Sequence, residues 1–275
     1  MERKNCFQIE EEHQQTFGVI KFGGSSLADS KSVDVCVNTV LADNFLAVVV
    51  SAPGETTNLI RAILDQSHRL DNYESLFSIY SEIINGLGLA DSGLVEKCFR
   101  EFDERMQKNE PEEVLAWGEW SMAQIFAARL GGEFFDTKDL LKIRHVGDER
   151  RIDCTSAGLV QQKVTQSKGI CVFPGYYGTS VVDGKIMTLN RGGSDYTGIF
   201  VAHSLGMGLV KSTDVGGLWD NQGNVLSNAS YCDLERFDEE AKLINKQARD
   251  FAISTNTPIW IKCSKNSDFV GTIIC

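Results

Sequence analysis

The stretch "VIKFGGSS" (residues 19–26) joins an apolar run to a lysine and then to a bare, hydroxyl-rich turn. Residues 18–22 predict a strand, and Gly23 and Gly24 allow backbone N–H groups to approach a ligand closely. Lys21 adds a point charge at the end of that strand. Together these groups suit phosphate, although a surface turn after a strand would show the same pattern. The spacing matches neither the Walker loop nor the dinucleotide fingerprint.

The elements predicted around this stretch indicate an α/β protein. A helix (31–43), the apolar run "FLAVVVSA" (45–52) and a second helix (57–69) follow it, which is the rhythm of a parallel sheet buried on both faces. We therefore expect a mainly parallel central sheet with helices on both faces, and a helical lobe over residues 73–131. The remaining predictions are strands at 133–137, 169–173, 258–263 and 271–275, a hairpin at 175–189, helices at 194–206 and 238–255, and a strand before Thr213.

Composition excludes several classes of function. The 275 residues carry a formal net charge of −11, so the surface does not favour nucleic acid as a partner. No apolar run is long enough to span a membrane, and residues 1–17 read as a polar arm without the apolar core of a secretory signal. The eight cysteines form no C-x-x-C pair and predict reduced thiols. We expect a cytoplasmic location.

Polar, glycine-containing segments follow several predicted strands, where an open α/β sheet binds ligands. In "NRGGSDYTG" (190–198), Arg191 can clamp a carboxylate, and Ser194 and Asp195 open a helix whose N-terminus attracts anions. Asp195 either stabilises that helix or orients a lysine. Thr213 and Asp214 in "STDVGG" either hold a nucleotide or form a local turn. Glu119 lies in an apolar helix and needs a partner, either a protein cation or a ligand amine.

Taken in order, these segments resemble the aspartokinase branch of the amino-acid kinase family. The resemblance rests on "VIKFGGSSLAD", "VVVSAPGETTNLI", "LAWGEWSMAQIFA", "FPGYYGTS", "TLNRGGSDYTG" and "STDVGGLW", and it runs from about residue 18 to residue 275. It implies a carbamate-kinase-like three-layer sandwich and one catalytic domain over 18–275. It also implies transfer of the ATP γ-phosphoryl group to the side-chain carboxylate of L-aspartate, with Mg²⁺ held through the phosphates and not by protein side chains.

The resemblance also implies roles for individual residues. Lys21 would stabilise the transferring phosphoryl group, Asp195 would orient Lys21, and Lys242 would reach the ATP phosphates, with Lys246 as the alternative. The other ATP-side residues implied are Gly23, Gly24, Thr213 and Asp214. The substrate-side residues implied are Ser51, Thr57, Glu119, Arg191, Gly193 and Ser194, with Glu119 meeting the substrate ammonium and Arg191 a carboxylate.

The chain departs from the family pattern in two places. After the nucleotide strand it reads "LWDNQGNVL" (218–226), closer to the shorter hairpin of acetylglutamate kinases, so the grip on ATP is expected to differ. The sequence also stops where the family's catalytic domain stops, so we expect no regulatory ACT domain and no feedback control through one. Family members usually dimerise, and a homodimer is expected.

Two alternatives stay open at this point. One is a kinase of another acidic amino acid or of an acylated derivative, in which Glu119 would have no ammonium to meet. The other is a catalytically silent binding protein or partner subunit, which the altered hairpin favours and the presence of Lys21, Arg191 and Asp195 opposes.

Overall fold

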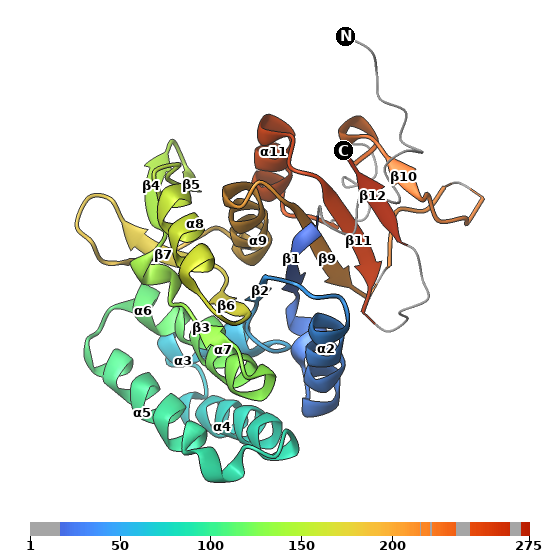
Figure 1. The fold of residues 1–275 in the computed structure, drawn as a ribbon. Coiled ribbons are helices and arrows are strands. Elements are labelled where there is room, and N and C mark those ends of the chain that lie inside the picture. Colours follow the sequence, from blue (N-terminus) through green and yellow to red (C-terminus); the bar gives the residue numbers. More distant parts are fainter. Residues whose placement is uncertain (1–16, 215, 221, 235–242, 265–270) are drawn as a thin grey trace, which may run out of the picture.

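The structure is a computed structural model that describes residues 17–214, 216–220, 222–234, 243–264 and 271–275. Its central sheet contains β1 (Phe17–Phe22), β2 (Ala47–Val50), β3 (Glu133–Phe134), β6 (Cys171–Pro174), β9 (Gly208–Thr213), β10 (Asn228–Ala229), β11 (Ile259–Cys263) and β12 (Thr272–Ile274). The strands lie in the order β10–β12–β11–β9–β1–β2–β6–β3 (Figure 1). Only the β11–β12 pair is antiparallel among these described strands, which confirms the mainly parallel sheet.

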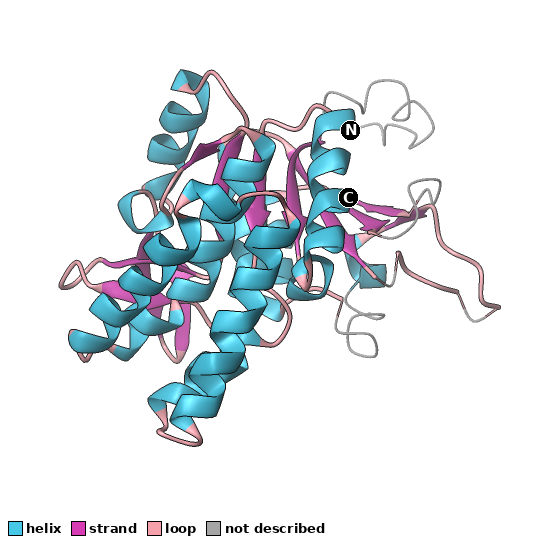
Figure 2. Cartoon of the chain, turned by 90° about the horizontal axis from the view of Figure 1, so that it is seen from below, coloured by secondary structure: helices cyan, strands magenta, loops and turns pink. Residues whose placement is uncertain are grey.

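Helices cover both faces of this sheet, as Figure 2 shows from below. One face packs against α2 (Ser30–Ala42), α3 (Thr56–Leu64), α4 (Arg69–Gly86), α5 (Leu94–Gln107), α6 (Pro111–Leu115) and α7 (Trp117–Leu130). The other packs against α8 (Ser156–Gln166), α9 (Gly193–Ser204) and α11 (Lys246–Thr255). The described residues also include three short 3-10 helices, η3 (Gly24–Leu27), η4 (Ala90–Ser92) and η5 (Thr137–Asp139). The three-layer α/β architecture is therefore as predicted.

The alternation of side chains along β1 decides which face receives its lysine. Successive residues of a strand point to opposite faces of the sheet. Ile20 and Phe22 belong to the apolar cluster on the α2 and α7 face, where the Phe22 ring lies 5.8 Å from that of Phe126. Val19 belongs to the cluster on the α9 face. Lys21 has the parity of Val19, so its side chain leaves the sheet toward α9.

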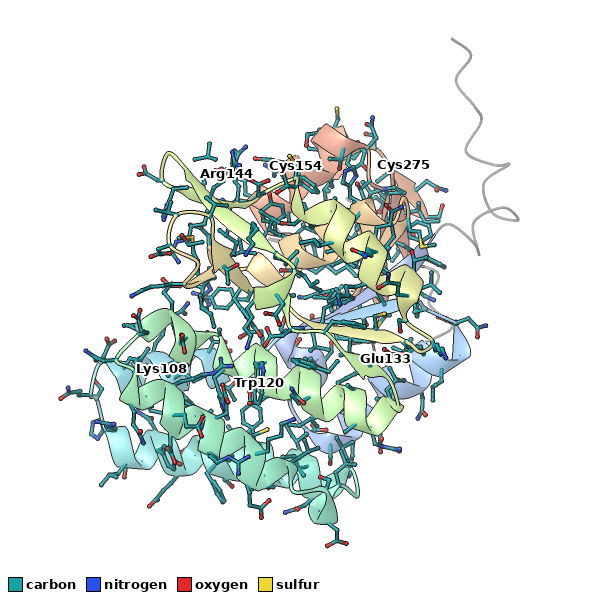
Figure 3. All side chains as sticks on the ribbon, turned by 60° about the vertical axis from the view of Figure 1, so that its left-hand side comes forward. Lys108, Trp120, Glu133, Arg144, Cys154 and Cys275 are labelled. Carbon is teal, nitrogen blue, oxygen red and sulfur yellow. The ribbon has the colours of Figure 1, made fainter. Side chains whose placement is uncertain are left out.

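The predicted helical lobe is present and starts earlier than expected. Helices α4 to α7 occupy most of the chain from Arg69 to Leu130, whereas α3 ends at Leu64 instead of continuing to residue 69. Figure 3 shows Lys108 and Trp120 in this helical layer and Arg144 on the opposite side of the molecule. No helix in the described ranges combines the length and the apolar character that a membrane span requires.

A second, four-stranded sheet was only half predicted. It runs β5–β4–β7–β8 and contains β4 (Lys142–Val146), β5 (Glu149–Ile152), β7 (Tyr177–Ser180) and β8 (Ile186–Thr188). The antiparallel β7–β8 pair confirms the predicted hairpin at 175–189. The β4–β5 hairpin was missed because its sequence, "KIRHVGDERRID", is mostly charged and lacks the apolar alternation of a half-buried strand. Helix α8 was also missed.

Within the described residues, the observed helix begins later than the predicted helix 238–255. Helix α11 begins at Lys246, because the Asn245 side chain accepts hydrogen bonds from the backbone N–H groups of Gln247 and Ala248. Asparagine is a strong N-cap, and the capping residue itself lies outside the helical conformation. Residues 243–245 are therefore a turn that leads into the helix.

One glycine of the second sheet is fixed by a backbone contact. A Cβ atom on Gly178 would lie 2.4 Å from the carbonyl oxygen of Leu141, so β7 could not keep its place beside the chain that leads into β4. We predict that Gly178→Ala lowers the free energy of unfolding by about 3 kcal/mol, measured by chemical denaturation. As a matched control, Gly158→Ala in α8 meets no atom within 4 Å and should stabilise the protein by about 0.5–1 kcal/mol. Equal stability of both variants would contradict this packing.

Candidate active site

A cavity with a volume of about 260 Å³ lies where β1, β2 and the first turns of α7 and α9 converge. It lies beyond the carboxyl ends of the parallel strands, where ligands bind in open α/β sheets. The residues that line it are Lys21, Gly24, Ser51, Ala52, Gly54, Glu55, Thr57, Asn58, Arg61, Glu119, Tyr176, Arg191, Gly192, Gly193, Ser194 and Asp195. The volume suits one small molecule.

Asp195 forms a buried bridge between two lysines at the inner end of this cavity. Its Oδ1 atom lies 2.8 Å from Nζ of Lys21, and its Oδ2 atom lies 2.6 Å from Nζ of Lys211. Lys21 and Lys211 are direct partners on the neighbouring strands β1 and β9, so their side chains leave the sheet side by side on the α9 face. Asp195 meets them there because it lies in the first turn of α9.

The two ammonium groups determine the protonation state of Asp195. Burial alone would raise the pKa of Asp195, but the ammonium groups of Lys21 and Lys211 outweigh it and hold that pKa well below its ordinary value. Asp195 is therefore ionised at neutral pH. One carboxylate is thus shared by two ammonium groups at a place that is largely shielded from water, and Lys21 also lines the cavity. An anionic ligand in the cavity would meet the ammonium group of Lys21.

Glu119 is the carboxylate on the opposite wall. It lies in the first turn of α7 with 4% of its surface exposed, and among the described residues its Oε2 atom has no hydrogen-bond partner. Desolvation raises the pKa of Glu119 to about 8, against the opposing effects of backbone hydrogen bonds and of the charges of Lys21 and Arg61. A buried carboxyl group with an unused oxygen that faces a cavity is suited to an ammonium group of a ligand.

The Arg191 loop forms the mouth of the cavity, and the turn before α11 anchors it. The side-chain amide of Asn245 donates a hydrogen bond to the carbonyl oxygen of Arg191, and Asn245 packs on Gly192, whose φ of 84° suits glycine. The Arg191 side chain itself is exposed and lines the cavity. The loop thus holds a guanidinium at the entrance while Ser194 lies buried behind it.

Glycines let two loops meet at the floor of the cavity. The N–H of Gly54 donates a hydrogen bond of 2.8 Å to the carbonyl oxygen of Gly24, and a Cβ atom on Gly24 would lie 2.7 Å from the carbonyl oxygen of Ala52. The glycine loop after β1 is therefore pressed against the loop after β2. Helix α3 starts directly after this second loop and presents Thr57 to the cavity.

Most of the residues predicted from the sequence meet in this one cavity. Lys21, Gly24, Ser51, Thr57, Glu119, Arg191, Gly193, Ser194 and Asp195 all line it. Gly23 adjoins it, since a Cβ atom there would lie 3.6 Å from Nζ of Lys21. Their functional roles stay predictions.

Among the described ATP-side residues, Thr213 and Asp214 do not line this cavity. Thr213 ends β9 and donates a hydrogen bond to Asp214, which lines a separate hollow with Ser25, Ser26 and Ser264. Lys242 lies outside the described residues. The alternative, Lys246, forms an exposed ion pair with Asp250 one turn further along α11.

Three residues of the site were missed in the sequence. Lys211 carries a charge in the middle of a buried strand, "GLVKST", and that signal could have identified it. Arg61 lies four residues after Thr57 and hence on the same face of α3. Tyr176 adopts a φ of 78° although it is not glycine, and no sequence pattern indicated this strained position.

The described residues include no group of three or more histidine, cysteine, aspartate or glutamate side chains placed to hold a metal ion. Asp195 already accepts contacts from two ammonium groups, which makes it a poor ligand for a divalent cation.

Comparison with known proteins identifies the family of the chain. A sequence model of the amino acid kinase family matches residues 17–262. Similar proteins include lysine-sensitive aspartokinase 3 of Escherichia coli strain K12, 27% identical over 94% of this chain and 64% of the relative. Aspartokinase 3 of Bacillus subtilis strain 168 is 29% identical over 92% of this chain and 62% of the relative. The chain thus spans less than two thirds of the length of these relatives.

Solved structures show the same fold. The aspartate kinase of Clostridium acetobutylicum matches with a TM-score of 0.80 at 26% identity, covering 94% of this chain and 62% of that one. Aspartokinase III of E. coli, in complex with aspartate and ADP, matches with a TM-score of 0.79 at 22% identity, covering 94% of this chain and 64% of that one. The resemblance recognised in the sequence is confirmed.

The raised pKa of Glu119 makes the stability of the ligand-free protein depend on pH. The folded protein keeps this proton up to about pH 8, whereas the unfolded chain releases it near the ordinary value of 4.5. Unfolding therefore releases a proton between these values, and the free energy of unfolding falls as pH rises through this window. We predict that Glu119→Gln removes this contribution, so the variant gains stability relative to wild type from pH 5 to pH 8.

Chemical denaturation of both proteins at a series of pH values measures the effect. The exposed Glu104 provides a matched control, since Glu104→Gln should follow the wild-type pH profile closely. If Glu119→Gln also follows that profile, Glu119 is ionised in the folded protein at neutral pH and this account of the carboxyl group is wrong.

Proposed function

Because the chain belongs to the amino acid kinase family, we propose that it transfers the γ-phosphoryl group of ATP to the side-chain carboxylate of L-aspartate, forming 4-phospho-L-aspartate. The observation that carries the proposal is the Lys21–Asp195–Lys211 bridge, of which Lys21 and Asp195 line one cavity together with Glu119 and Arg191. Similar proteins named aspartokinases support the choice of substrate.

The ammonium group of Lys21, which lines the cavity, is the part of the bridge suited to phosphoryl transfer. Catalysis of this reaction depends on positioning and on neutralising charge around the transferred group, with little covalent work for the protein. Lys21 would stabilise the transferred phosphoryl group, and Asp195 would keep its ammonium in place. Lys211 would share the same carboxylate and add a second positive charge on the nucleotide side.

The opposite wall supports an amino acid with a free ammonium group. Glu119 would ionise when that ammonium arrives and would bind it, and Arg191 at the mouth would bind the carboxylate that is not phosphorylated. An N-acylated substrate would leave Glu119 buried without a partner. This feature favours aspartate over an acylated derivative.

ATP would enter from the glycine loop after β1. Gly23 and Gly24 would let backbone N–H groups approach the phosphates, and Thr213 and Asp214 at the end of the neighbouring β9 would lie toward the nucleoside. Mg²⁺, if used, would be held by the phosphates and water, which is its usual manner of binding at nucleotide sites.

The test is an ADP-release assay with L-aspartate, L-glutamate and their N-acetyl derivatives, combined with trapping of the acyl phosphate by hydroxylamine. We predict turnover and hydroxamate formation with L-aspartate. Lys21→Met should lower kcat by about a thousandfold, because the main charge on the transferred group is removed. The exposed Lys31 is a matched control, and Lys31→Met should keep wild-type activity.

Other results would redirect the proposal. Turnover only with an N-acetylated substrate would refute aspartate as the acceptor. Binding of aspartate and ATP without any ADP release would indicate a silent binding protein. Adding lysine or threonine to the same assay tests the expectation that this chain responds to neither.

A further inference from the structure

Arg61 is a guanidinium in the cavity that forms no ion pair with any acidic side chain in the described part of the chain. It lies in α3, is half-buried, and lines the cavity one helical turn after Thr57. Within the described ranges no carboxylate oxygen lies within the 4.0 Å limit of an ion pair with it. A partly buried arginine in a chain with a net charge of −11 would be expected to have such a partner.

The contacts that Arg61 does make are weak. Its Nη2 atom donates to the hydroxyl of Tyr176 at 3.3 Å, and its Nη1 atom reaches Oδ1 of Asn58 at 3.5 Å. Both acceptors are neutral, and both distances exceed those of a good N–H···O hydrogen bond. These contacts orient the guanidinium toward the cavity and leave most of its donor capacity unused.

The location of Arg61 relative to Glu119 indicates which ligand group it would meet. Arg61 and Glu119 line the same cavity, and the charge of Arg61 is one of those that oppose the desolvation raising the pKa of Glu119. In an α-amino acid the ammonium and the carboxylate are attached to the same carbon, so their protein partners must also be close together. The other cation that acts on Glu119, Lys21, is held by Asp195. Arg61 is therefore the guanidinium placed to accompany Glu119.

We propose that Arg61 binds the α-carboxylate of the substrate, acting with Arg191, and so selects amino acids that carry a free carboxylate beside a free ammonium. This inference rests on the proposed function, since it names a recognition residue for the same substrate. Glu119 and Arg61 then form a matched pair for the zwitterionic end of the substrate, and the side-chain carboxylate extends toward Lys21.

The experiment compares L-aspartate with its α-amide, which keeps the ammonium and the side-chain carboxylate but lacks the α-carboxylate charge. Wild type should prefer aspartate in kcat/KM by at least a hundredfold. Arg61→Ala should reduce that preference at least tenfold by lowering kcat/KM for aspartate while changing that for the amide little. Arg61→Lys should keep an intermediate preference, because it retains the charge without the bidentate geometry.

The exposed Arg100, in α5, is the matched control, and Arg100→Ala should keep the wild-type preference. A purely structural role of Arg61 would lower kcat/KM for both substrates by the same factor, and that result would overturn the inference while the kinase assignment stands. Equal turnover of both substrates by wild type would do the same. Absence of turnover with any amino acid would refute the proposed function, and this inference with it. If Arg61→Ala does not fold, the same comparison is made with Arg61→Lys.

Discussion

The candidate site depends on one buried interaction, the carboxylate of Asp195 held between the ammonium groups of Lys21 and Lys211. The pairing register of β1 and β9 puts the two lysines side by side, and the first turn of α9 supplies the carboxylate. Without that carboxylate, two ammonium groups would repel each other in a place shielded from water. With it, both ammonium groups are held in place, and Lys21 presents a fixed cation to the cavity.

Glycines and caps hold the other groups around this bridge. Gly24 lets the loops after β1 and β2 touch, and the capping residue of α11, Asn245, ties the Arg191 loop in place. The resulting cavity is lined by both cations and carboxyl groups. Lys21 and Asp195 lie beside the glycine loop, and Glu119 and Arg61 line the same cavity and are the pair proposed to bind the zwitterionic end of the substrate.

The core of this fold could be predicted from the sequence, because its signals are local and apolar. The β-branched run of β2 and the strand β1 that precedes the glycine turn predict a parallel sheet. The order of the polar segments along the chain indicates the site. The β4–β5 hairpin was missed because its residues are mostly charged, and its partner strand β7 lies more than 30 residues away in the chain. The start of α11 depends on a single cap. Lys211 joins the site through the pairing register of β1 and β9, and Arg61 joins it through the periodicity of α3. Neither property is evident from a short stretch of sequence.

The most direct measurement of the central claim is a crystal structure with aspartate and a non-hydrolysable ATP analogue. The account predicts that the terminal phosphate lies within hydrogen-bonding distance of Nζ of Lys21, and that Asp195 still contacts both Lys21 and Lys211. A Lys21 side chain turned away from the triphosphate, with Asp195 on the far side of the nucleotide, would contradict the assignment of this cavity to phosphoryl transfer.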